Sequence, residues 1–198
     1  MPIKGKTEKI VFGLDLGQSK DYTAICGVEV VKKMGEYNMV IRYLKRWPLN
    51  TGYPDIVKDV KRLIINTRET QKKNPFLVID YTGVGRPVFD MFKSIGLEPK
   101  GINIHGGNTV TREGGVYNVP KRDLVGVLQV LYQNERIKIS GDLKEKDTLN
   151  KELLNFKVKI TDSGQDTYSA WRERDHDDLV LAVTCACWYG NKKSQWGW

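Results

Sequence analysis

Four aspartates occupy positions where the surrounding sequence is apolar. Asp15 lies within the apolar run of residues 10–16, and Asp80 closes the run of residues 76–79. Asp177 and Asp178 open a third apolar stretch near the C-terminus. A carboxylate is rarely buried without a partner, and acids held by a rigid core are suited to bind a divalent cation. We therefore predict that these four aspartates are metal ligands and catalytic residues.

The chemistry that such a set of acids can support is phosphodiester hydrolysis with two metal ions. The ions lie roughly 3.5–4 Å apart and stabilise both the attacking and the leaving oxygen, so the acids must converge from different elements. Hard ions such as Mg²⁺ prefer oxygen ligands. We expect Mg²⁺ or Mn²⁺ as the cofactor.

Each acid also has a purely structural explanation. Asp15 could cap the turn at Gly17, and Asp80 could close an Asx-turn before Thr82. Asp177 or Asp178 could serve only as the N-cap of a helix, favoured by the helix dipole. Three such positions in one chain favour the metal hypothesis over three separate coincidences.

Composition indicates a soluble globular protein with an anionic partner. The chain has 198 residues, of which 40% are hydrophobic and 28% charged, and its formal net charge is +8. This length predicts a single domain over residues 1–198, with two small domains as the alternative, and a flexible tail at 190–198. The positive charge favours a polyanion such as nucleic acid, although a basic enzyme that binds none remains an alternative.

Cysteine usage and hydropathy favour an intracellular location. The chain has three cysteines in apolar surroundings, which argues against a disulfide framework and for a reducing compartment. The first residues lack the apolar segment of a signal peptide, and no apolar run reaches membrane-spanning length. We expect a protein that is not secreted and has no membrane partner.

Hydrophobic periodicity predicts an α/β fold. Three strands with short turns between them form an antiparallel meander at residues 9–16, 22–31 and 37–47. Two further strands are expected at 76–80 and around 102–104, and a short edge strand at 137–139. Helical spacing is found from about residue 53, at 88–95, from 120, around 149–156 and at 178–189.

The regions between these elements are predicted as a surface loop at 105–115 and a hairpin at 158–174 that turns at 162–165. A meander followed by alternating helices and strands gives a mixed central sheet, with parallel strands added to the antiparallel ones and helices on its faces. The first strand has the longest apolar run and should be central.

Three segments, in this order, resemble the nuclease domain of tailed-bacteriophage terminase large subunits. They are Phe12-Gly13-Leu14-Asp15-Leu16-Gly17, Val78-Ile79-Asp80-Tyr81-Thr82-Gly83-Val84-Gly85 and His176-Asp177-Asp178-Leu179-Val180-Leu181-Ala182. Residues 119–124 also resemble that family, and the similarity extends over residues 10–188. The resemblance implies a ribonuclease-H-like fold and a metal-dependent endodeoxyribonuclease that cuts concatemeric viral DNA during genome packaging.

The resemblance also assigns roles to individual residues. Asp15 matches the acid of the first strand, which bridges the metals, and Asp80 matches the second acid. Asp177 and Asp178 match the acidic pair at the start of the last helix. The implied partners are double-stranded DNA, a packaging ATPase domain, the small terminase subunit and the portal, in the cytoplasm of a bacterial host cell.

One feature of that family is missing from the sequence. Terminase large subunits carry an N-terminal packaging ATPase, and this chain has no Gly-x-x-x-x-Gly-Lys-Ser/Thr loop. We therefore expect no ATP site, and we expect an isolated nuclease domain or a short stand-alone relative.

Several cations and one histidine are candidates for supporting roles. Lys121 and Arg122, in the first turn of a helix, could bind a phosphate that offsets their conflict with the helix dipole. Arg86, Arg172 and Arg174 are candidate DNA contacts. The alternative for Arg86 is a pair with a surface acid such as Asp90, and for the other four cations it is simple surface charge. His176, beside the acid pair, could orient a ligand carboxylate or relay a proton, or it could make a structural hydrogen bond.

Other functions fit parts of the same pattern. A Holliday-junction-resolvase-like nuclease would use a similar set of acids on the same fold. An actin-like or sugar-kinase-like ATP-binding module has comparable glycine-rich turns, but it needs two large lobes and 198 residues are too few. A non-catalytic module that binds DNA or a portal would not depend on the acids at all.

Overall fold

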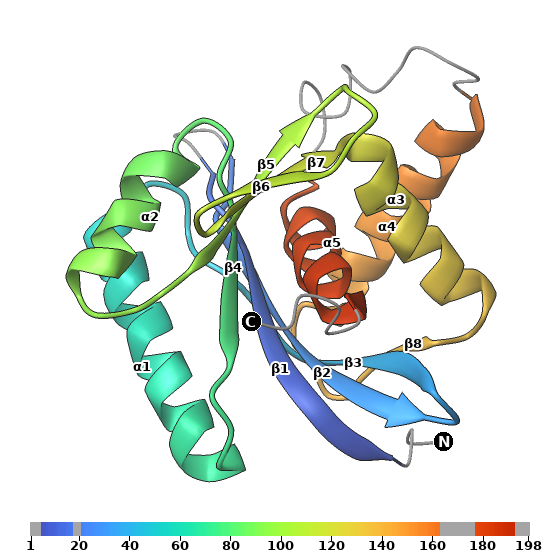
Figure 1. Ribbon diagram of the computed structural model, residues 1–198, viewed down its shortest axis with the longest axis horizontal. Coiled ribbons are helices and arrows are strands. Elements are labelled where there is room, and N and C mark those ends of the chain that lie inside the picture. Colours follow the sequence, from blue (N-terminus) through green and yellow to red (C-terminus); the bar gives the residue numbers. More distant parts are fainter. Residues whose placement is uncertain (1–4, 18–20, 163–176, 193–198) are drawn as a thin grey trace.

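The protein consists of a mixed sheet between two groups of helices (Figure 1). The computed structural model describes residues 5–17, 21–162 and 177–192, with the side chains of 156–162 excepted. Its strands are β1 (Lys6–Asp15), β2 (Ala24–Lys33), β3 (Glu36–Arg46), β4 (Phe76–Asp80), β5 (Lys100–His105), β6 (Thr111–Glu113), β7 (Val116–Pro120) and β8 (Ile137–Ile139). Its helices are α1 (Tyr53–Gln71), α2 (Gly85–Ser94), α3 (Lys121–Gln133), α4 (Lys146–Asp162) and α5 (Asp178–Asn191).

The described strands lie in the order β6-β7-β5-β4-β1-β2-β3-β8. Strands β1, β2 and β3 form the predicted antiparallel meander, whereas β4 pairs parallel to β1, and β5 and β7 continue the parallel part. Strand β1 is therefore interior, as predicted. The predicted mixed sheet, an antiparallel meander with parallel strands added to it and helices on its faces, is confirmed.

The two faces of the sheet carry separate apolar cores. Alternate residues of β1 belong to different cores because successive side chains of a strand point to opposite faces. Val11 packs with buried residues of α3 and α5, and Phe12 and Leu14 pack with those of α1 and α2. Figure 1 shows the same division, with α1 and α2 on one face and α3, α4 and α5 on the other.

Helix α5 is apolar nearly all round, and it is buried over almost its whole length. A Cβ atom placed on Gly13 of β1 would overlap the carbonyl oxygen of Ala182 and would lie 2.8 Å from the amide nitrogen of Ala186. The backbone of α5 thus lies directly on the backbone of β1. This close approach explains why a glycine interrupts the apolar run before Asp15.

Two predicted elements were wrong in part. Alternation of Val158 and Ile160 with lysines indicated the first strand of the hairpin at 158–174, but α4 continues through Asp162. Extending a helix that has already started needs no new nucleation, so local strand-like alternation did not prevail. The remainder of that hairpin, including its predicted turn beyond Asp162, lies outside the described residues.

The predicted surface loop at 105–115 contains strand β6, which pairs antiparallel with β7. All three residues of β6 are exposed, so no apolar pattern marked the strand. The pairing depends on backbone hydrogen bonds and on the turn at Gly114, whose φ is 55°.

Near the C-terminus, α5 includes Gly190 and Asn191, two residues beyond the predicted end of the last helix. No helix among the described residues is long and apolar enough to cross a membrane.

Replacement of Gly13 by alanine should destabilise the fold strongly. The new methyl group would overlap backbone atoms of α5, which cannot move without displacing the helix from the sheet. We expect Gly13→Ala to lower the free energy of unfolding by about 1–3 kcal/mol or more, as measured by urea denaturation.

Gly126→Ala is the matched control, because Gly126 lies within α3 and an added Cβ has no neighbour within 4 Å. Alanine is the better helix former, so this variant should gain about 0.5–1 kcal/mol. Equal stability of the two variants would contradict the close packing of α5 on β1.

Candidate functional site

Asp15 and Asp80 end two neighbouring strands on the same face of the sheet. Strands β1 and β4 are parallel and pair Gly13 with Val78 and Leu14 with Ile79, so the next residue of each strand is the aspartate. Along β1, Asp15 points to the same face of the sheet as Val11, and along β4, Asp80 points to the same face as Val78. Both valines pack in the core that contains α5. The structure therefore places these two carboxylates side by side beneath α5.

Helix α5 brings the other two acids to the same end of the sheet. It runs antiparallel to β1, since its C-terminal Gly190 faces β2 and β3 near their far ends while Ala182 lies over Gly13. Asp178 lies one turn before Ala182, about 6 Å along the axis. Asp15 lies two residues beyond Gly13, about 7 Å in the same direction.

The four predicted acids are all buried, although they carry ionisable groups. Their exposed fractions are 8% for Asp15, 2% for Asp80, 4% for Asp177 and 5% for Asp178. We call this group the acidic corner. Carboxylates buried this deeply require compensating partners, because transfer of a charge from water is costly.

Arg46 is one such partner, and the sequence analysis missed it. The pairing register places Ala24 of β2 next to Asp15 and Arg46 of β3 next to Ala24. Arg46 shares the face of Leu44, which packs with α5. Its Nη2 lies 3.2 Å from Oδ2 of Asp178, and its guanidinium lies 3.9 Å from the centre of the Tyr22 ring.

Glu152 of α4 is the second residue that the sequence analysis missed. Its Oε2 accepts hydrogen bonds from the backbone amides of Leu179 (3.0 Å) and Val180 (3.1 Å), and its Oε1 lies 3.5 Å from Nη1 of Arg46. Burial raises the pKa of Glu152 to about 7, and the charge of Asp178 acts in the same direction, whereas the Val180 amide and Arg46 lower it.

A sequence signal for Glu152 existed. Leu149, Glu152 and Leu153 follow helical spacing, so a charged residue lies on the apolar side of α4. A charge at such a position indicates a buried partner. Arg46 gave no comparable signal, because it follows Lys45 at the end of a strand, where charged residues are common.

Asp80 has one of the structural roles considered for these acids, whereas the side chain of Asp177 does not cap α5. The amide of Thr82 donates a hydrogen bond of 2.9 Å to Oδ1 of Asp80, so Asp80 does close an Asx-turn, in addition to its place beside Asp15. Asp177 occupies the N-cap position of α5 but makes no capping hydrogen bond with its side chain. Glu152 performs that capping instead.

The donor chemistry of the acidic corner fits a hard divalent cation, since carboxylate oxygens come from β1, β4 and α5. Among the described residues, however, no group of three or more acid, histidine or cysteine side chains is arranged closely enough to hold a metal ion. One carboxylate oxygen of Asp178 is already engaged by Arg46. The structure thus brings the predicted ligands to one place without a formed coordination shell.

The predicted cations lie partly at the same edge of the sheet. The carboxyl ends of the parallel strands β4, β5 and β7 share one edge, and α2 and α3 begin there. Arg86 in α2 and Arg122 in α3 are exposed, and Lys121 is half-buried. Arg122 donates to the carbonyl of Asn108 and lies 3.6 Å from Asp123. Three other predicted residues, Arg172, Arg174 and His176, lie outside the described residues.

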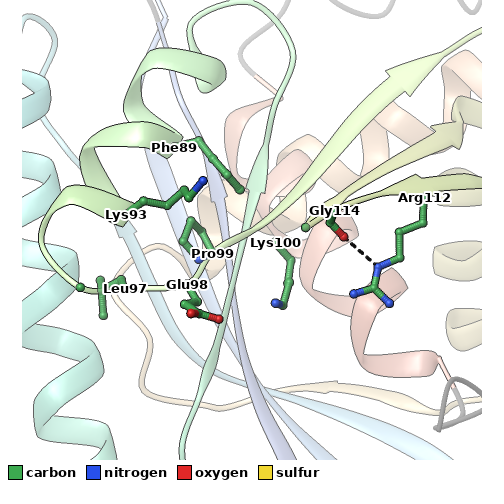
Figure 2. Close-up of a pocket in the computed structure, with 10 residues that line it drawn as sticks. Phe89, Lys93, Leu97, Glu98, Pro99, Lys100, Arg112 and Gly114 are labelled. Atoms are coloured by element: carbon green, nitrogen blue, oxygen red, sulfur yellow. Dashed lines mark hydrogen bonds between the residues drawn. The ribbon is translucent and has the colours of Figure 1, made fainter. Parts of the chain in front are cut away.

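A surface hollow elsewhere in the molecule has a different character (Figure 2). It lies between the end of α2 and the turn from β6 to β7, and its charged lining residues are Lys93, Glu98, Lys100 and Arg112. None of the predicted acids lines it. A hollow that is mainly basic cannot supply the ligands of a divalent cation, so we do not assign the predicted metal chemistry to it.

Comparisons with known proteins identify the fold. No protein-family model and no curated protein matches the chain. Among solved structures, the nuclease domain of the human cytomegalovirus terminase matches with a TM-score of 0.55 and 15% identity, over 91% of this chain and 82% of that domain. The same domain, Mn-soaked and inhibitor-bound, matches with a TM-score of 0.52 and 13% identity, over 89% and 80%.

The nuclease domain of the large terminase of bacteriophage SPP1, with bound Mn, matches with a TM-score of 0.49 and 13% identity, over 91% and 86%. The cytomegalovirus domain carries the conclusion, because its similarity extends over most of both chains. The resemblance indicated by the three aspartate motifs is therefore confirmed at the level of architecture, and the chain has the fold of a terminase nuclease domain.

Proposed function

We propose that this protein is a metal-dependent endodeoxyribonuclease that cuts concatemeric viral DNA during genome packaging. The proposal is supported by the burial of Asp15, Asp80, Asp177 and Asp178, by the adjacent ends of β1 and β4, and by the start of α5 at the same end of the sheet. Burial of several carboxylates close together lowers the stability of the folded protein. A function that requires these acids explains why they are present. The shared fold and the Mn-soaked cytomegalovirus domain support the same proposal.

Asp15 and Asp80 would hold the ions between them from adjacent strands, and Asp177 and Asp178 would complete the ligand set from α5. When bound, Mg²⁺ or Mn²⁺ supplies the positive charge that stabilises the transition state of phosphodiester hydrolysis. The sheet and α5 hold the four carboxylates in fixed positions before DNA arrives. No protein nucleophile is required, because water is the attacking group.

DNA would approach the carboxyl edge of the sheet. Arg86, Lys121 and Arg122 lie at that edge and would contact phosphates. Contacts to phosphate position a duplex without reading its sequence, so cleavage should depend little on sequence. A packaging ATPase, the small terminase subunit and the portal are the proposed protein partners, in the cytoplasm of a bacterial host.

Cutting of plasmid DNA should require a divalent cation and the predicted acids. We expect the protein to nick or linearise supercoiled plasmid with Mg²⁺ or Mn²⁺ and to be inactive in EDTA. Asp15→Asn and Asp80→Asn should each reduce the rate by about 100-fold or more, because a ligand charge is lost while the side-chain shape is kept. Gel electrophoresis of a time course measures the rates.

Asp90→Asn is the matched control, since Asp90 is an exposed carboxylate on α2. This variant should cut like the parent. Parental rates in both Asp15→Asn and Asp80→Asn would refute the nuclease assignment of these acids. Linear duplex and a four-way junction of equal length should be cut at similar rates, whereas a strong preference for the junction would favour a resolvase.

The proposed phosphate contacts predict a change in salt dependence. Lys121→Ala combined with Arg122→Ala should weaken binding to duplexes of any sequence and reduce the slope of log affinity against log salt by about 2. Fluorescence anisotropy with Ca²⁺ in place of Mg²⁺ measures both quantities. The control is Lys32→Ala combined with Lys33→Ala, at the opposite end of β2 from Asp15, which should leave the slope nearly unchanged. Equal slopes for the two double variants would remove Lys121 and Arg122 from the DNA interface.

A further inference from the structure

Arg46 and Glu152 form a buried charged network with Asp178. The guanidinium of Arg46 lies 3.2 Å from Asp178 through one nitrogen and 3.5 Å from Glu152 through another. The exposed fractions of the three side chains are 15%, 6% and 7% respectively. Glu152 in turn accepts both hydrogen bonds from the first turn of α5.

The network joins three elements at the acidic corner. Arg46 comes from the end of β3, Glu152 from α4, and Asp178 from the start of α5. Through Ala24, Arg46 also occupies the same row of the sheet as Asp15. The strand pairing therefore fixes the position of Arg46 relative to Asp15.

A buried ion-pair network of this kind contributes little to the free energy of folding. Two acids and one base lose their hydration together, and well-packed apolar side chains of similar volume often stabilise a protein as much or more. The geometry is also incomplete as a structural network, since Nε of Arg46 and Oε1 of Glu152 are buried without a hydrogen-bond partner among the described residues. A buried ionic network with unsatisfied atoms is costly, so its presence calls for an explanation other than stability.

We propose that Arg46 and Glu152 are positioning residues for the acidic corner. Glu152 fixes the first turn of α5 through the amides of Leu179 and Val180, and Arg46 fixes the orientation of the Asp178 carboxylate. Together they set where the acidic pair of α5 lies relative to Asp15 and Asp80. This inference rests on the proposed metal-dependent function.

Metal binding without DNA is the measurement that tests the proposal, because it requires no turnover. Electron paramagnetic resonance of free Mn²⁺ gives the dissociation constant for the parent and each variant. Arg46→Met removes the bridge, and Glu152→Gln removes the charge while it keeps an acceptor for the α5 amides. Each should weaken Mn²⁺ binding by about 10- to 100-fold, as is typical for residues that orient metal ligands.

A conservative variant separates orientation from charge. Arg46→Lys keeps a positive charge but cannot span Asp178 and Glu152 with a planar fork. We expect its Mn²⁺ affinity to lie between those of the parent and of Arg46→Met. In plasmid cutting, the Mn²⁺ concentration for half-maximal rate should rise in the same order, with a smaller change in the rate at saturating Mn²⁺.

Arg42→Met is the matched control. Arg42 lies on the same strand and pairs with Glu29 at 2.8 Å, but its side chain is 50% exposed. This variant loses an arginine–glutamate pair without touching the acidic corner, so its Mn²⁺ affinity should equal that of the parent. Thermal unfolding verifies that each variant is folded, and Arg46→Lys decides the question if the less conservative changes do not fold.

Two results would overturn the inference in distinguishable ways. If folded Arg46→Met, Arg46→Lys and Glu152→Gln bind Mn²⁺ within twofold of the parent while Asp15→Asn does not bind it, the network is only structural and the proposed function stands. If the parent itself does not bind Mn²⁺, or Asp15→Asn binds it as the parent does, the proposed function fails and the positioning role fails with it.

Discussion

The contact between the backbones of α5 and β1 at Gly13 is the constraint on which the candidate site depends. Since an added Cβ atom would overlap the carbonyl of Ala182, the helix can lie this close only over a residue without a side chain. The antiparallel course of α5 then brings its N-terminus to the end of β1 that carries Asp15. A helix held further from the sheet, or reversed, would leave Asp177 and Asp178 remote from the strand acids.

Bringing acids together creates an electrostatic problem that the fold must offset. The N-terminus of α5 carries a partial positive charge, which favours the nearby carboxylates. Glu152 adds a further acid to that helix end, and its pKa is raised to about 7 mainly by burial. Arg46 lies between Glu152 and Asp178 and supplies a counter-charge within the protein. The cost of burying these acids is therefore offset in part by Arg46 and by the dipole of α5.

Most of the fold was accessible from sequence because its central elements obey simple patterns. Strand β4 was predicted with its observed bounds, and β1 was correctly placed inside the sheet, since both are short apolar runs that end at an acid. Strand β6 escaped prediction because three exposed residues carry no apolar pattern. The end of α4 was predicted wrongly, because the alternation of apolar and charged residues after residue 157 does not show that a helix begun earlier continues through them.

The acids of the candidate site could be proposed from the sequence, whereas the residues that contact them could not be identified from it. An aspartate inside an apolar run stands out without any knowledge of its neighbours, as Asp15 and Asp80 did. Arg46 and Glu152 are 106 positions apart, and only tertiary packing shows that both contact the start of α5. The capping of α5 illustrates the difference, because sequence proximity pointed to Asp177 and the structure uses a side chain from another helix.

In the proposed chemistry, the exposed residues and the buried residues at the carboxyl ends of the strands have opposite effects on DNA. Exposed Arg86 and Arg122 favour a phosphate backbone, whereas a group of buried carboxylates repels it. Divalent cations would reverse the sign of the field at the acids, so DNA could reach the hydrolytic groups only after the metal is bound. In the proposed mechanism, the separation of the buried acids from the peripheral cations would make metal binding the condition for productive contact with DNA.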